Sequence, residues 1–85
     1  MPFYVNIPPR IEKRIKKFPQ KDLIRVRTTI AALAFDPFMG KKLEGKYKGD
    51  YSVRVWPYRI IYTIKKKELI IEVIEIEPRG GAYKK

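Results

Sequence analysis

Two arginines and a serine carry the clearest chemical signal in this sequence. Arg54 and Arg59 lie in two alternating, strand-like segments on either side of Trp56-Pro57. A turn with an even number of residues at this point would place the two guanidinium groups directly opposite each other. Like charges paired across strands are destabilising unless an anion compensates them. Because guanidinium binds phosphate through two parallel hydrogen bonds, the pair predicts an anion site, with Ser52 on the same face.

The same alternation assigns the other side of this hairpin to the protein interior. Three apolar side chains should point there, namely Val53, Val55 and Ile60. The arginines would then lie on a free face of the sheet. The alternative is that Arg59 simply forms an ion pair with an acid such as Glu72 or Glu75 on a neighbouring strand.

The residue types that are absent exclude several enzyme classes. The 85 residues include no histidine and no cysteine, so a Ser-His-Asp triad, a thiol nucleophile and a His- or Cys-based zinc site are impossible. Catalysis would have to use Arg, Lys, Tyr, Asp or Glu. A metal-dependent nuclease is disfavoured because Glu72, Glu75 and Glu77 lie on one strand, and strict alternation turns Glu72 away from the other two. No cofactor is expected.

The charge of the chain indicates a polyanionic partner. Twenty Lys and Arg residues stand against nine Asp and Glu, giving a formal charge of +11. A charge this large on so small a domain attracts polyanions, and nucleic acid is the expected one. For the lysines of the first helix, a merely solvated surface is the alternative. A glycine-punctuated segment adds further candidate phosphate contacts, Lys41, Lys42, Lys46 and Lys48.

Hydrophobic periodicity predicts an α+β fold with the order β-α-α-β-β-β. Residues 1–85 are too few for two cores, so one domain is expected. A small twisted antiparallel sheet should carry a two-helix hairpin on one face and leave the other free. No run of about 20 apolar residues and no signal-peptide pattern is present, so a cytoplasmic protein without membrane contact is expected. The predicted strands cover residues 3–7, 51–56, 58–64 and 69–77, and the predicted helices 10–18 and 21–35, with a loop at 38–50.

Two spaced motifs resemble the RelE/ParE toxin superfamily. The first is Leu43-x-Gly-x-x-x-Gly-Asp-Tyr-Ser-Val-Arg-Val-Trp-Pro-Tyr-Arg-Ile-Ile-Tyr, and the second is Arg79-Gly-Gly-Ala-Tyr83 near the end of the chain. The order of elements and the length agree with that superfamily as well. The chain departs from the pattern at Ser52, where several members have a basic residue, and at Pro78, where many have histidine.

The resemblance implies a toxin of a type II toxin–antitoxin system. RelE-like members enter the A site of the 30S ribosomal subunit and cut mRNA, whereas ParE-like members poison DNA gyrase. The matching Arg54, Arg59, Arg79 and Tyr83 favour the RelE-like activity. An acidic, RelB-like antitoxin is the implied partner. A non-catalytic ParE-like gyrase inhibitor and a general RNA-binding domain are the alternatives.

Cleavage of this kind needs no metal, because the ribose 2′-OH can attack its own 3′-phosphate. Such a reaction requires a base, positive charge on the phosphorane oxygens and an acid for the leaving oxygen. The resemblance assigns these roles to three residues. Tyr83 would be the base, Arg59 would clamp the phosphate, and Arg79 would stabilise charge or protonate the leaving group. For Tyr83, packing over the sheet edge is the alternative.

Overall fold

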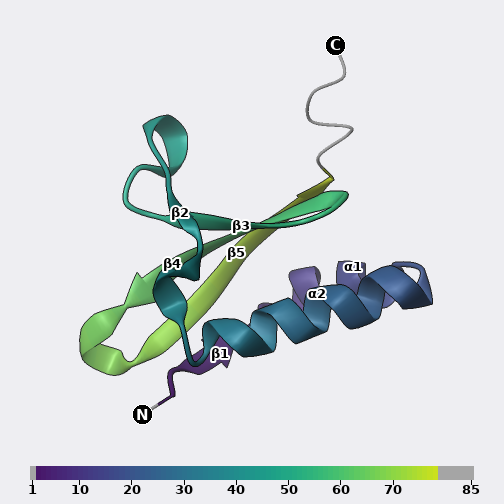
Figure 1. Ribbon diagram of the computed structural model, residues 1–85, viewed down its shortest axis with the longest axis horizontal. Coiled ribbons are helices and arrows are strands. Elements are labelled where there is room, and N and C mark those ends of the chain that lie inside the picture. The colour runs from purple at the N-terminus through teal and green to yellow at the C-terminus, as the bar shows by residue number, and fades with distance from the viewer. Residues whose placement is uncertain (1, 79–85) are drawn as a thin grey trace.

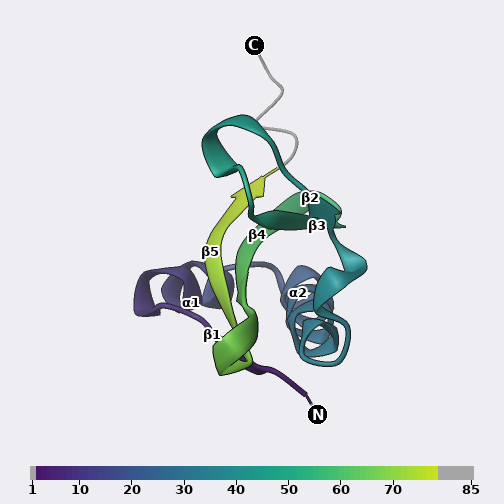
Figure 2. The same ribbon diagram turned by 90° about the vertical axis from the view of Figure 1, so that its left-hand side faces the viewer.

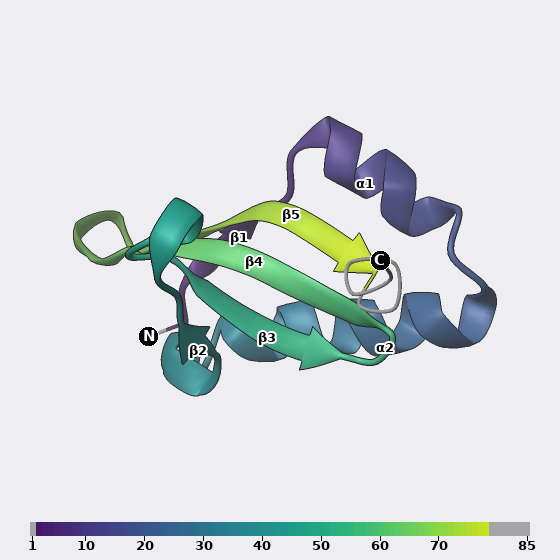
Figure 3. The ribbon, with the colours of Figure 1, turned by 90° about the horizontal axis from the view of Figure 1, so that it is seen from above.

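Two helices cover one face of a five-stranded sheet, and within residues 2–78 the opposite face carries no α-helix (Figures 1 and 3). The computed structural model describes residues 2–78. The strand order is β1-β5-β4-β3-β2. The elements are β1 (Tyr4–Asn6), α1 (Pro9–Lys16), α2 (Gln20–Leu33), β2 (Lys41–Lys42), β3 (Tyr51–Val55), β4 (Tyr58–Lys65) and β5 (Ile70–Pro78), with short 3₁₀ turns at Pro37–Met39, Gly45–Tyr47 and Lys66–Glu68.

The predicted α+β architecture is confirmed, with two differences in the sheet. First, β1 pairs with β5 in parallel, so the sheet is mixed rather than purely antiparallel. Period-two alternation identifies a strand but does not say which strand it joins. Second, the segment predicted as a loop contains β2, whose two lysines pair with β3. A two-residue strand is too short to show any periodicity.

The helices end earlier than predicted, at Lys16 and Leu33 rather than at residues 18 and 35. The chain reverses between α1 and α2 (Figure 3), and their apolar stripes pack on the sheet. The main core combines residues from both layers: Ile11, Ile15, Val26 and Ile30 from the helices, and Val55, Ile60, Val73 and Ile76 from the sheet. As predicted, Val53 packs against this cluster from the same side. No helix within residues 2–78 is long and apolar enough to cross a membrane.

Helix α1 also protects an exposed edge of β5. Strand β1 pairs with β5 only as far as Glu72, so within residues 2–78 the carbonyls that face the outer edge of β5 beyond that point have no neighbouring strand. Arg10 donates to the carbonyl of Ile74 at 3.0 Å, and Arg14 donates to that of Ile76. Both arginines also bind the Glu75 carboxylate. An unpaired strand edge invites pairing with another chain, and these two side chains occupy it.

The ion pairs of the helices predict a loss of stability in acid. Burial tends to raise the pKa of Glu75, but hydrogen bonds from Arg14 and Arg10 outweigh it and hold that pKa below 4.5. A hydrogen bond from Arg27 lowers the pKa of Glu12 in the same way. A carboxyl with a depressed pKa stabilises the fold above its unfolded pKa, and this contribution is lost as pH falls through the folded value. We expect the free energy of unfolding, measured by urea denaturation, to be flat down to about pH 5 and to fall below it. Glu75→Gln should make that fall shallower, and an identical fall in the variant would contradict the assignment.

Candidate functional site

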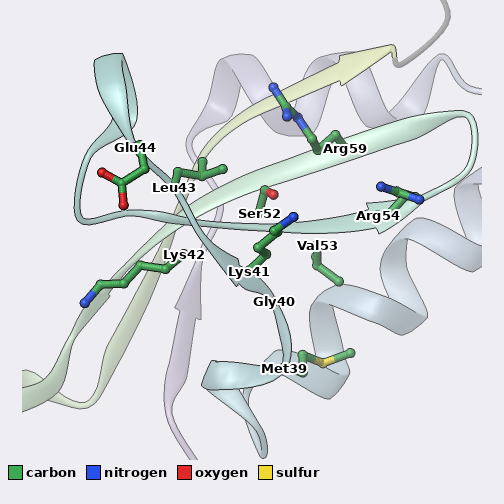
Figure 4. Close-up of a pocket in the computed structure, with 10 residues that line it drawn as sticks. All are labelled: Met39, Gly40, Lys41, Lys42, Leu43, Glu44, Ser52, Val53, Arg54 and Arg59. Carbon is green, nitrogen blue, oxygen red and sulfur yellow. The ribbon is translucent and has the colours of Figure 1, made fainter.

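The uncovered face of the sheet carries a row of charged side chains across three strands. Arg54 of β3 lies directly opposite Arg59 of β4, as the two-residue turn predicted. Arg59 in turn lies opposite Glu77 of β5. Figure 4 shows the side chains of Arg54 and Arg59 on the same side of the hairpin. Because neighbouring strands are about 4.8 Å apart, the row brings two guanidinium groups and a carboxylate within reach of one nucleotide.

A second row lies beside the first, toward the middle of the sheet. It contains Lys41 of β2, Ser52 of β3 and Ile61 of β4. In Figure 4 the Lys41 amine lies beside Ser52, whereas Lys42 points away from the arginines, as its neighbouring position in the strand requires. Ser52 is 8% exposed and Ile61 is fully buried. Lys41 therefore adds a third cation to the open face, and Ser52 lies beside it in the surface of the sheet.

These residues surround a hollow of about 560 Å³. Loop residues 43–50 rise from the sheet beside it, on the side away from the helices (Figure 2). Four of the six predicted phosphate-contact residues line the hollow together with the predicted catalytic Arg59, whereas Lys46 and Lys48 do not; the lining residues are Met39, Gly40, Lys41, Lys42, Leu43, Glu44, Ser52, Val53, Arg54 and Arg59. The predicted catalytic residues Arg79 and Tyr83 lie outside the described residues.

Arg59 is ion-paired, and its partner differs from the predicted one. The Nη2 atom of Arg59 donates to Oε1 of Glu77 at 2.9 Å. The acids considered from the sequence are engaged elsewhere, since Glu72 pairs with Lys65 at 3.2 Å and Glu75 pairs with the arginines of α1. Arg59 therefore pairs with an acid of the neighbouring strand, as the alternative interpretation predicted, but this acid is Glu77 and not Glu72 or Glu75.

A β-bulge explains this difference. From Lys65 to Tyr62, β4 pairs with β5 in one constant register. If this register continued, Arg59 would lie opposite Ile76, but it shifts by one residue between Tyr62 and Ile61. One extra residue in β5 turns Glu75 and Glu77 to the open face. The prediction that Glu72 faces away from them is wrong for the same reason, because it lies opposite Thr63 on that same face. Glu77 and Glu72 each pair with one cation and Glu75 pairs with two, and within residues 2–78 no cluster of acidic residues could hold a metal ion.

Arg54 differs from the other arginines that the structure describes in having no ion pair. Within residues 2–78, it is the one arginine without an acidic partner; Arg10, Arg14, Arg25, Arg27 and Arg59 all have one. Its side chain is also exposed. The guanidinium of Arg54 is thus available to an incoming anion. The guanidinium of Arg59 must first release the Glu77 carboxylate.

A buried tyrosine positions the loop that closes the hollow. The hydroxyl of Tyr62 donates to the carbonyl of Pro37 at 2.7 Å and accepts from the N–H of Gly40 at 3.2 Å. Burial raises the pKa of Tyr62, so it remains a neutral donor at physiological pH. A Cβ on Gly40 would lie 2.5 Å from both that hydroxyl and the Ser52 carbonyl. The sequence reasoning missed both residues, although a tyrosine within a central strand signals that its hydroxyl needs a buried partner.

The fold and the hollow define a small, basic α+β domain that presents cationic side chains on an uncovered sheet face. Residues 6–83 match the family described as the ParE toxin of the type II toxin–antitoxin system parDE. The "Putative toxin RelE1" of Methanocaldococcus jannaschii is 33% identical over 88 residues, covering 99% of this chain and 98% of that protein. The chain therefore belongs to the RelE/ParE superfamily, the toxins of type II toxin–antitoxin systems.

Solved structures agree with this assignment. The archaeal RelE–RelB complex from Pyrococcus horikoshii OT3 contains a chain with 27% identity and a TM-score of 0.82, with 94% of this chain and 98% of that chain covered. The RelBE2 toxin–antitoxin complex from Mycobacterium tuberculosis gives the same TM-score at 23% identity, with 93% of each chain covered. At that lower identity the likeness concerns the fold alone.

Proposed function

We propose that this chain is a metal-independent endoribonuclease that cuts mRNA in the A site of the ribosome. The observation that carries the proposal is the gathering of Arg54, Arg59 and Lys41 around one hollow on the uncovered sheet face. A nucleotide phosphate matches the charge and the geometry of two adjacent guanidinium groups. The 33% identity to the M. jannaschii protein named as a RelE toxin supports the RelE-like activity.

The proposed reaction needs only groups of the protein and the RNA. A base removes the proton of a ribose 2′-OH, and the oxygen attacks the adjacent phosphorus. The bond from phosphorus to the 5′ oxygen of the next nucleotide breaks, and that oxygen receives a proton. The products are a 2′,3′-cyclic phosphate and a 5′-hydroxyl. Positive charge that is already in place stabilises the phosphorane oxygens without reorganisation.

We assign catalysis to Arg59, Arg79 and Tyr83. Arg59 clamps the phosphate, Arg79 stabilises developing charge, and Tyr83 takes part in proton transfer. Phosphate contacts come from Arg54 and Ser52 and from four lysines, Lys41, Lys42, Lys46 and Lys48. Since the chain lacks histidine, much of the rate must come from the ribosome, which holds the mRNA in a reactive geometry.

The expected partners follow from the charge of +11 and from the solved relatives. The ribosome and its mRNA are polyanions that attract such a protein. The P. horikoshii structure is a complex of RelE with RelB. We therefore propose an acidic, RelB-like antitoxin that neutralises the open face. Activity would be cytoplasmic, where the ribosomes are.

Mapping of mRNA 5′ ends on programmed ribosomes tests the proposal. We expect cuts in phase with the codon in the A site, carrying 5′-hydroxyl ends and persisting in EDTA. They should disappear in Arg79→Ala and Tyr83→Phe and remain in the control Lys67→Ala, which removes an exposed charge of the β4–β5 turn. The same RNA without ribosomes should stay intact. Uncut mRNA on ribosomes would overturn the proposal.

A ParE-like activity is the second candidate, because the family that matches residues 6–83 is described by the ParE toxin. In that case the cationic face would bind rather than cut, and mRNA on the ribosome would stay intact. A supercoiling assay with purified DNA gyrase distinguishes the two. Inhibition of gyrase with no mRNA cleavage supports the ParE-like activity, and the absence of both activities would leave general RNA binding.

A further inference from the structure

We propose that Glu77 is the general base of the cleavage reaction, an inference that rests on the proposed function. Glu77 ends the charged row on the open face, opposite Arg59 and two strands from Arg54. Its Oε1 atom lies 2.9 Å from Nη2 of Arg59. A phosphate bound by the two arginines would therefore have its ribose beside this carboxylate.

Protonation states at neutral pH favour a carboxylate for this role. A base must be unprotonated, and glutamate is ionised at pH 7, whereas a phenol titrating near 10 holds its proton. The catalytic group should also carry the correct protonation state at the working pH. In a chain without histidine, Glu77 is thus a better base than a tyrosine.

Glu77 is also accessible to a substrate. Its side chain is 28% exposed and that of Arg59 is 30% exposed, so the pair lies at the surface rather than in the core. An ion pair at such a site holds little net free energy. A phosphate can therefore take over the guanidinium of Arg59 at small cost, and this exchange releases the carboxylate next to the bound nucleotide.

The other acids of this face are less suitable. Glu75 is held by Arg10 and Arg14 at the edge of β5, and Glu72 is paired with Lys65. Glu44 lines the hollow, but in Figure 4 it points away from Arg54 and Arg59.

The proposed step is balanced as follows. The Glu77 carboxylate takes the 2′-OH proton while the 2′ oxygen bonds to phosphorus, with Arg59 and Arg54 on the phosphate oxygens. The bond from phosphorus to the leaving 5′ oxygen breaks, and that oxygen takes a proton from water. The proton on Glu77 then neutralises the hydroxide formed, which restores the carboxylate.

Single-turnover cleavage on programmed ribosomes with Glu77→Gln tests this assignment. The amide still accepts a hydrogen bond from Arg59 but cannot take a proton. We expect the cleavage rate to fall about 10²- to 10⁴-fold, with ribosome binding unchanged. The matched control is Glu72→Gln, which removes the same charge from the same strand and face and should cleave normally.

The pH profile gives a second measurement. Glu77 is faced by Arg59 on β4 and Arg54 on β3, with Glu75 beside it on β5 and Arg14 of α1 bound to the neighbouring Ile76 carbonyl. Carboxyl groups as a class titrate near 4 and phenols near 10, so a carboxylate base and a phenolate base predict different profiles between about pH 6 and pH 9. With Glu77 as base the wild-type rate should be flat over this range, whereas a phenolate base would make it rise about tenfold per pH unit.

The possible outcomes separate this inference from the proposed function. If the wild type cuts mRNA and Glu77→Gln cuts as fast or faster, Glu77 only neutralises Arg59 and the inference is overturned, while the nuclease proposal stands. A rate that rises steeply with pH also overturns it. If the wild type leaves mRNA intact, the proposed function fails and this inference fails with it.

Discussion

Replacing Arg59 by glutamine is expected to lower the rate of mRNA cleavage on the ribosome about 10²- to 10³-fold. Arg59 is the central cation of the row, flanked by Arg54 and Glu77. Its loss removes charge stabilisation from the transition state and leaves the Glu77 carboxylate uncompensated beside the phosphate. Single-turnover rates on programmed ribosomes measure the effect. Arg59→Lys should be nearly as impaired, because an ammonium cannot bind phosphate through a planar fork.

Two other arginine variants serve as comparisons for this result. Arg54→Gln should mainly weaken ribosome binding, because Arg54 is exposed and has no ion pair to rearrange within residues 2–78. The slope of log affinity against log salt concentration should decrease by about one, as expected for the loss of one phosphate contact. Arg25→Gln removes an arginine that is likewise ion-paired, to Asp22 on α2, and should cleave normally. Equal losses in Arg25→Gln and Arg59→Gln would mean that net charge alone matters.

Replacing Gly40 by alanine is expected to destabilise the protein by about 1–3 kcal/mol and to distort the hollow. The added Cβ would lie 2.5 Å from the Ser52 carbonyl and from the Tyr62 hydroxyl. The Ser52 carbonyl belongs to the β3 backbone, so it can move only if the β2–β3 pairing moves with it. Lys41 would then shift away from the arginines. Urea denaturation measures the first effect, and cleavage on ribosomes measures the second.

A double-mutant cycle with Tyr62→Phe shows whether this contact is the cause. Tyr62→Phe alone should cost about 1 kcal/mol, because it leaves the Pro37 carbonyl and the Gly40 N–H without their partner. It also removes one of the two atoms that the new methyl group meets. The combined variant should therefore be more stable than the sum of the two single changes predicts. Strict additivity would contradict the proposed packing of Gly40 on Tyr62.

Local patterns in the sequence were enough to predict the parts of the site that depend on neighbouring residues. The two-residue turn at Trp56-Pro57 determines that Arg54 faces Arg59, because the register of a hairpin follows from its turn. Alternation along β3 then sends Arg54 to one face and Val55 to the core. Helical spacing likewise puts Ile11 and Ile15 on one stripe of α1 and Val26 and Ile30 on one stripe of α2, and all four are buried. These features need only the geometry of a single strand, turn or helix.

The partner of Arg59 and the walls of the hollow were decided by tertiary structure. One extra residue in β5 moves Glu77 rather than Ile76 opposite Arg59, and no pattern within β5 indicates where that bulge falls. The parallel pairing of β1, the short strand β2 and the contact of Gly40 with Tyr62 join segments far apart in the chain. Such pairings are chosen by how the whole sheet packs on its helices. The sequence by itself therefore determined which cations share a face, and only the packed sheet determined which carboxylate lies beside them.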